Sequence, residues 1–74
     1  MTARIRPIGM LKQYTQNLQE IKVESGKSVL ETLADLGIPS EIVSLVMVNQ
    51  KPKNKDYVIQ DDDFVQIMAI IGGG

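Results

Sequence analysis

The sequence predicts an α+β domain in which one short helix packs on one face of a mixed sheet of four to five strands. Several short segments alternate apolar and polar residues, which is the period of a half-buried strand. One segment, residues 29–36, instead has helical spacing between recognisable helix-end residues. The chain has 74 residues, of which 43% are apolar and 23% charged, so we expect one small globular domain.

Residues 29–36 have the clearest end signals in the chain. Ser28 and Glu31 have the spacing of a capping box, in which each side chain accepts a hydrogen bond from the other residue's backbone N–H. Gly37 suits the left-handed conformation that ends many helices, and Pro39 prevents continuation. The buried stripe of this helix is expected to be apolar, with Val29 or Leu36 at its edge and with Leu30, Leu33 and Ala34 along it.

Strand patterns occur in five segments, which are residues 2–8, 19–24, 45–49, 56–59 and 64–71. Pro7 cannot donate a ladder hydrogen bond, so it is expected to face an unpaired side of the first strand or to mark a bulge. The third segment begins with the apolar run Leu45 to Val48 and is predicted to be buried on both faces. Residues 50–55 and Asp61 to Asp63 are predicted to be turns.

The composition excludes several classes of function. The chain has no cysteine and no histidine, so disulfides, thiolate metal sites and most acid–base catalysis lack their usual residues. The net charge of −1 argues against binding nucleic acid through a basic face. No apolar run approaches the length of a membrane span, and we expect no secretory signal, because no apolar core follows the basic residues near the N-terminus. We therefore expect no metal, no nucleic acid and no membrane, and a cytoplasmic location.

The last strand is expected to present one face to a partner, because one helix cannot cover both faces of a sheet. Val65, Ile67 and Ala69 are assigned to the core side. The apolar residues expected to form a docking surface on or beside the other side are Phe64, Met68, Ile70 and Ile71. Burial of this strand on both faces is the alternative.

The chain then ends in Gly72, Gly73 and Gly74. We expect residues 1–71 to form the domain and residues 72–74 to form a flexible tail. Without side chains, such a tail can enter a narrow channel in another protein and present the Gly74 carboxylate there. A frayed end or a linker stub is the alternative.

Four stretches together resemble one family. They are Ile5 to Gly9, Ser25 to Leu30, Val46 to Asn49 and the terminal Gly73-Gly74. The chain resembles the ubiquitin-like sulfur carriers of the β-grasp fold, which include the thiamine-biosynthesis sulfur carrier and the small subunit of molybdopterin synthase. It departs from them at Asp62, where the family usually has glycine, and in Met68 to Ile71, which lacks the proline-containing ending of the molybdopterin type.

The resemblance implies a protein sulfur carrier and not an enzyme. A ubiquitin-activating-enzyme-like adenylyltransferase would use ATP to adenylate Gly74. A sulfur donor of the cysteine desulfurase or rhodanese type would then form a thiocarboxylate, and a synthase would accept the sulfur for thiamine or molybdenum cofactor. The carrier would hold no cofactor and would be a monomer when free. Two other functions stay open: a ubiquitin-like modifier attached to proteins through Gly74, and a non-covalent binding module with an inert tail.

Overall fold

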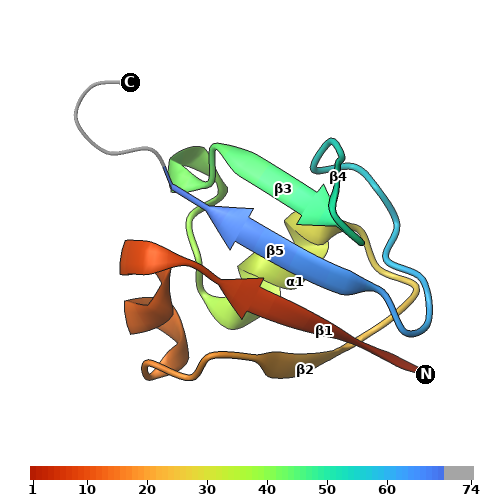
Figure 1. Ribbon diagram of the computed structural model, residues 1–74, viewed down its shortest axis with the longest axis horizontal. Coiled ribbons are helices and arrows are strands. Elements are labelled where there is room, and N and C mark those ends of the chain that lie inside the picture. The colour runs from red at the N-terminus through yellow and green to blue at the C-terminus, as the bar shows by residue number, and fades with distance from the viewer. Residues whose placement is uncertain (70–74) are drawn as a thin grey trace.

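The computed structural model describes residues 1–69, and Figure 1 shows their arrangement. The elements in chain order are β1 (Thr2–Pro7), the 3-10 helix η1 (Gly9–Thr15), β2 (Ile21–Glu24), α1 (Val29–Leu36), the 3-10 helix η2 (Ser40–Ile42), β3 (Leu45–Val48), β4 (Lys51–Pro52) and β5 (Phe64–Met68). The strands form one five-stranded sheet in the order β2-β1-β5-β3-β4, and α1 packs across one face. Among the strand pairs of the described residues, only β1 and β5 run parallel. This confirms the predicted β-grasp fold.

The first strand shows why the sheet tolerates a proline near its centre. The N–H groups of Arg4 and Ile8 donate to the β5 side, to Asp63 O and Ile67 O, both at 3.0 Å. The intervening odd-numbered nitrogens therefore point toward β2. The β1–β2 register ends at the pair Ile5 and Ile21, so the Pro7 nitrogen faces no strand partner among residues 1–69. Of the two expectations for Pro7, the unpaired side is confirmed.

The helix begins and ends at the predicted residues. Glu31 N donates to Ser28 Oγ at 3.0 Å, and Ser28 N donates to Glu31 Oε1 at 2.9 Å. Gly37 ends the helix with φ 75°. The predicted stripe is only partly right, because Leu33 is buried but Leu30 and Ala34 are exposed.

The helix instead buries Val29 and Thr32 beside Leu33. Thr32 can lie inside because its hydroxyl donates to Ser28 O at 3.0 Å. The buried apolar side chains form one core between sheet and helix: Ala3, Ile5, Leu11, Val29, Leu33, Ile38, Val43, Val46, Val48, Ile59, Val65 and Ile67.

Two strand predictions are wrong. The segment 56–59 contains only an isolated bridge between Ser28 and Val58, whereas the short strand β4 lies inside the predicted turn 50–55. The cause is a two-residue hairpin, in which Asn49 and Gln50 take φ 51° and 70° and turn the chain directly back onto β3. The second error concerns β3 itself. It is buried on one face only, because Val46 and Val48 are buried while Leu45 is 37% exposed.

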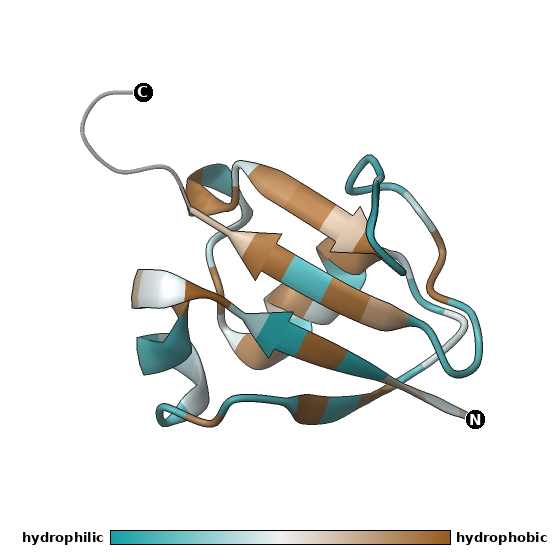
Figure 2. Ribbon diagram, in the orientation of Figure 1, coloured by the Kyte–Doolittle hydropathy of each residue, from teal (hydrophilic) through white to brown (hydrophobic). Residues whose placement is uncertain are grey.

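The hydropathy colouring in Figure 2 shows which strands are apolar along their length and which alternate. Apolar colour runs along β3, whereas β1 and β5 alternate between apolar and polar segments (Figure 2). No helix within residues 1–69 is long and apolar enough to cross a membrane. Nor do residues 1–69 contain a group of histidine, cysteine, aspartate or glutamate side chains that could hold a metal ion.

Candidate functional site

The sheet face opposite α1, which we call the open face, is the candidate site. On β1, β3 and β5 every second side chain is buried against the helix, so the intervening side chains point to the other side. The open-face residues of these strands are Thr2, Arg4, Arg6, Leu45, Met47, Phe64, Gln66 and Met68. The β3–β5 half of this face is mostly apolar, and the β1 part carries two arginines.

Strand β5 connects the open face to the C-terminal end of the described chain. Near its end it lies between the segments that carry η1 and η2 (Figure 1). Ile8 N donates to Ile67 O at 3.0 Å on one side, and Ser44 N donates to Met68 O at 2.8 Å on the other. Both neighbours therefore fix the direction in which β5 points.

The predicted docking residues are partly within the described region. Phe64 and Met68 lie on the open face and are half-buried. Val65 and Ile67 lie in the core, as expected, and Ala69 packs against it. The remaining predicted site residues lie outside the described residues, namely Ile70, Ile71, Gly72, Gly73 and Gly74.

Sequence reasoning did not assign Leu45, Met47 or Arg6 to the open face. Leu45 and Met47 were expected to be buried, because a continuously apolar strand gives the same pattern whether its second face packs in the core or meets a partner. Arg6 was read only as part of a family-like stretch. Its place after Ile5, in strict alternation with buried residues, is the signal that puts it on the open face.

A buried carboxylate fixes the start of β5. Asp63 is 6% exposed and accepts hydrogen bonds from Tyr57 Oη at 2.7 Å, Gln60 N at 2.8 Å and Asn49 Nδ2 at 2.8 Å. Asn49 Oδ1 in turn accepts from Phe64 N at 2.9 Å. Burial alone would raise the pKa of Asp63, but these hydrogen bonds outweigh it and hold the pKa below its ordinary value. The cluster ties the β3–β4 hairpin to β5.

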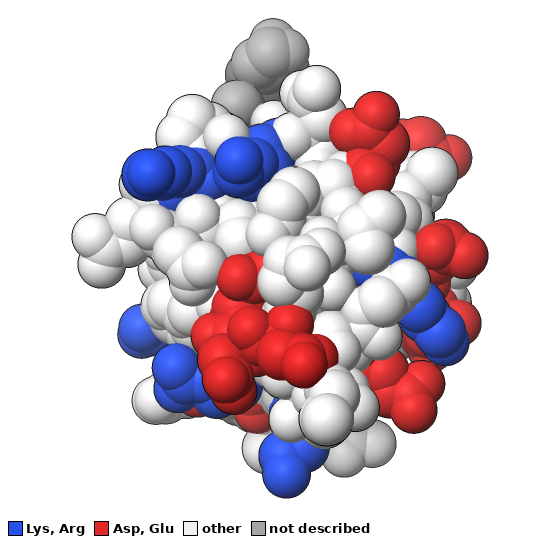
Figure 3. All heavy atoms as spheres, turned by 90° about the vertical axis from the view of Figure 1, so that its right-hand side faces the viewer, with Lys and Arg blue, Asp and Glu red and all other residues white. Residues whose placement is uncertain are grey.

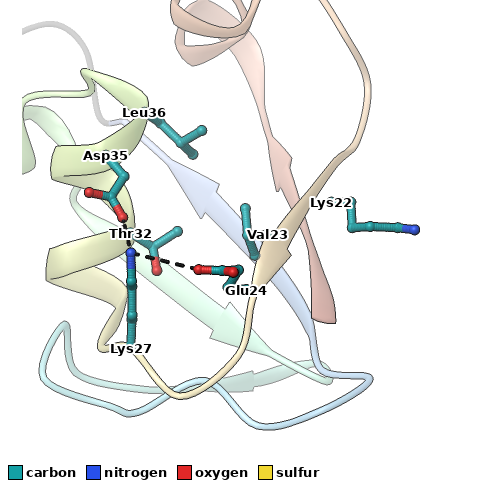
Figure 4. A pocket seen from close by; sticks show the side chains of 7 residues that line it. All are labelled: Lys22, Val23, Glu24, Lys27, Thr32, Asp35 and Leu36. Atoms are coloured by element: carbon teal, nitrogen blue, oxygen red, sulfur yellow. Dashed lines mark hydrogen bonds and ion pairs between the residues drawn. The ribbon is translucent and has the colours of Figure 1, made fainter. Parts of the chain in front are cut away.

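A pocket of about 190 Å³ lies on the helix side of the sheet, between β2 and α1 (Figure 4). Lys27 Nζ lies 2.8 Å from Asp35 Oδ2 and 4.0 Å from Glu24 Oε1. The hydrogen bond and charge of Asp35 raise the pKa of Lys27. Since this cation already has two carboxylate partners, the pocket offers no unpaired cation for an anionic ligand, and Lys22 points away from it (Figure 4).

The charges are mixed on the side of the molecule seen at the right of Figure 1. Acidic and basic side chains alternate in small groups over that surface (Figure 3). No single sign of charge dominates there, which does not favour a phosphate backbone as a ligand of that side.

Solved structures with this fold include proteins from an archaeon, a protozoan and a bacterium. A putative molybdopterin converting factor subunit 1 from Pyrococcus furiosus has a TM-score of 0.70 at 13% identity, over 96% of this chain and 99% of that one. Urm1 from Trypanosoma brucei has a TM-score of 0.72 at 15% identity, over 99% and 95%. A chain in the complex of subunits 1 and 2 of molybdopterin-converting factor from Helicobacter pylori has a TM-score of 0.64 at 18% identity, with both chains fully covered. At these identities the likeness shows the fold alone.

No curated protein matches the sequence. The model of the ThiS family matches residues 8–74, which is most of the chain and includes its terminal glycines. The chain therefore belongs to the ThiS family of ubiquitin-like sulfur carriers.

Proposed function

We propose that the protein carries sulfur as a thiocarboxylate on Gly74, and that a partner adenylyltransferase activates this residue. The observation that carries the proposal is the family match through residue 74, because it includes the three glycines in the family pattern. A glycine tail leaves no side chain near the attacked carbonyl, so Gly72 and Gly73 can thread a narrow active site. Partners bind the domain, residues 1–71, and this binding positions the tail.

The chemistry follows from the weak electrophilicity of a carboxylate. In the partner's active site, a Gly74 carboxylate oxygen attacks the α-phosphorus of ATP, displaces pyrophosphate and forms an acyl-adenylate. A persulfide of a cysteine desulfurase or rhodanese-type donor then attacks the carbonyl carbon and displaces AMP. A thiol cleaves the resulting S–S bond, which leaves the thiocarboxylate and a disulfide on the donor side. The carrier itself contributes no catalytic side chain, and ATP is bound by its partner.

The open face is the proposed docking surface for the adenylyltransferase. Phe64 and Met68 lie on the strand that leads to the tail, so a partner seated on them is also placed to receive Gly74. Ile70 and Ile71 extend the same apolar stretch in the sequence. Apolar side chains grouped on one face beside a reactive terminus are typical of a protein-binding surface.

The accepting pathway is proposed to be thiamine or molybdenum cofactor synthesis, in the cytoplasm. The Helicobacter pylori structure is a complex of subunits 1 and 2 of molybdopterin-converting factor. By analogy, a larger synthase subunit is a candidate acceptor for this chain, which we expect to be a monomer when free. Copurification with each candidate synthase from the same genome distinguishes the two pathways.

The absence of cysteine gives a direct test. The chain has no thiol side chain, so a thiol-alkylating reagent at neutral pH labels it only at a thiocarboxylate. The purified protein is incubated with the adenylyltransferase of its own genome, ATP and a persulfide donor. Intact-mass spectrometry is expected to show one oxygen replaced by sulfur, and alkylation is expected to add a single label at Gly74.

The matched control is Gly74→Val, which places a β-branched side chain at the attacked carbonyl. We expect no label on this variant and an unchanged free energy of unfolding, because chain ends contribute little to folding. Wild-type protein that never gains sulfur contradicts the proposal. An isopeptide bond from Gly74 to a lysine of another protein, without the thiocarboxylate, would instead identify a protein modifier. Unchanged partner binding and host phenotype after deletion of Gly73 and Gly74 would identify a non-covalent module.

A further inference from the structure

We propose that Arg6 is the charged anchor of the open face, and that it binds a carboxylate that the adenylyltransferase presents among apolar side chains. This inference rests on the proposed function and adds the chemistry of the partner's surface. It follows from a contrast between the two arginines of β1, which lie two residues apart on the same face.

Arg4 already has its partners within the domain. Its Nη1 lies 3.3 Å from Glu20 Oε1, and its guanidinium carbon lies 5.1 Å from the centre of the Phe64 ring. The guanidinium of Arg6 has no hydrogen-bond, ion-pair or ring partner among residues 1–69. A partner that covers this face therefore meets one arginine with a counterion and one without.

Arg6 lies in the middle of the sheet and beside its apolar half. β1 is flanked by β2 and β5, so Arg6 is not one of the charges that protect a sheet edge from unwanted pairing. Its register partner on β5 is Gln66, and Met47 of β3 follows in the same row. Because β1 and β5 are parallel, Arg6 also lies toward the end of the sheet from which the chain leaves β5 (Figure 1).

This position decides what a partner must supply. Covering Met47, Phe64 and Met68 removes water from the surface next to Arg6. Removing water from a guanidinium that gains no new acceptor is strongly unfavourable. A carboxylate that accepts two parallel N–H bonds from the arginine compensates this loss. The fitting partner surface is therefore apolar with an aspartate or glutamate opposite Arg6, and a fully apolar or basic surface is rejected.

The test measures binding of the purified adenylyltransferase to Arg6 variants by calorimetry, at low and at high salt. Arg6→Gln is expected to weaken binding about tenfold or more at low salt, and Arg6→Glu to weaken it further. Arg6→Lys should fall between wild type and Arg6→Gln, because lysine keeps the charge but not the two-pronged geometry. The salt dependence of binding should be smaller for Arg6→Gln than for wild type.

Lys22→Glu is the matched control, since it makes the same charge change on the outer strand β2 and Lys22 is exposed. It should leave the affinity close to that of wild type. Urea unfolding verifies that each variant is folded. Equal affinities for Arg6→Gln and wild type, with thiocarboxylate still formed, would overturn this inference and leave the proposed function standing. Equal losses for Lys22→Glu and Arg6→Glu would also overturn it, because the attraction would then be a general charge effect. If the wild-type protein does not bind the adenylyltransferase, both this inference and the proposed function are wrong.

Discussion

Replacing Asp63 by alanine tests whether the buried carboxylate holds β5 to the β3–β4 hairpin. The variant removes the acceptor for three hydrogen bonds, from Tyr57, Gln60 and Asn49. A donor left without its partner in a buried site costs about 1–3 kcal/mol. Tyr57 is half-buried and the other two donor residues are exposed, so water can reach them and the lower end of that range applies.

The expected loss is then about 3 kcal/mol, or about 1 kcal/mol for each donor. A domain of 74 residues has a free energy of unfolding of about 4–11 kcal/mol, so this loss is a large share of the total. With a denaturant slope of about 1 kcal/mol per M for a small protein in urea, the midpoint should fall by about 3 M. Asp63→Asn should lose less, because the amide oxygen can still accept from one or two of the donors.

The assay is equilibrium unfolding in urea at neutral pH, followed by circular dichroism. Asp56→Ala is the control, since Asp56 is exposed and has no side-chain hydrogen bond or ion pair within residues 1–69. It should unfold close to the wild-type midpoint. If Asp63→Ala and Asp56→Ala unfold at the same urea concentration, the three hydrogen bonds contribute nothing net and the structural account of this cluster is wrong.

Three further predictions use neighbouring features. The folded-state pKa of Asp63 lies below its ordinary value, so the ionised Asp63 stabilises the fold above about pH 4. This stabilisation is lost as pH falls through the folded-state pKa. In urea unfolding at acid pH, Asp63→Ala should not show this loss. Asp62 has φ 66°, so Asp62→Gly should raise the free energy of unfolding by about 0.5–1 kcal/mol, and a decrease would show that its side chain matters. Met68→Asp should weaken binding to the adenylyltransferase while lowering the urea midpoint far less than Val65→Asp, which places a charge in the core; similar losses of stability would assign Met68 to the core.

The helix could be predicted to the residue because its signals are local. Ser28, Glu31 and Gly37 act on backbone groups within one turn, and no distant contact is needed to satisfy them. The buried face of the same helix could not be predicted as well. Whether Leu30 or Val29 faces the sheet depends on how the helix is rotated on the strands, and an apolar residue at each position fits both rotations.

The β3–β4 hairpin and the burial of Asp63 could not be predicted from the sequence for a related reason. A turn with two left-handed residues is usually signalled by asparagine followed by glycine, and here Gln50 takes the second position. Asp61, Asp62 and Asp63 are chemically identical, yet only Asp63 is buried. What distinguishes Asp63 is that Tyr57 and Asn49 donate hydrogen bonds to it. These contacts form only in the folded domain.

The same limit explains why the open face is informative. One helix can bury only one side of the sheet, so apolar side chains on the other side contribute little to the core. Polar residues at Leu45, Met47, Phe64 and Met68 would leave the packing of Val46, Val48, Val65 and Ile67 intact and would improve solubility. A chain selected for stability alone has no use for a half-buried apolar surface in that place. Its presence on the strand that leads to Gly74, beside an arginine with no partner among residues 1–69, therefore supports the proposal that a partner binds this face while Gly74 reacts.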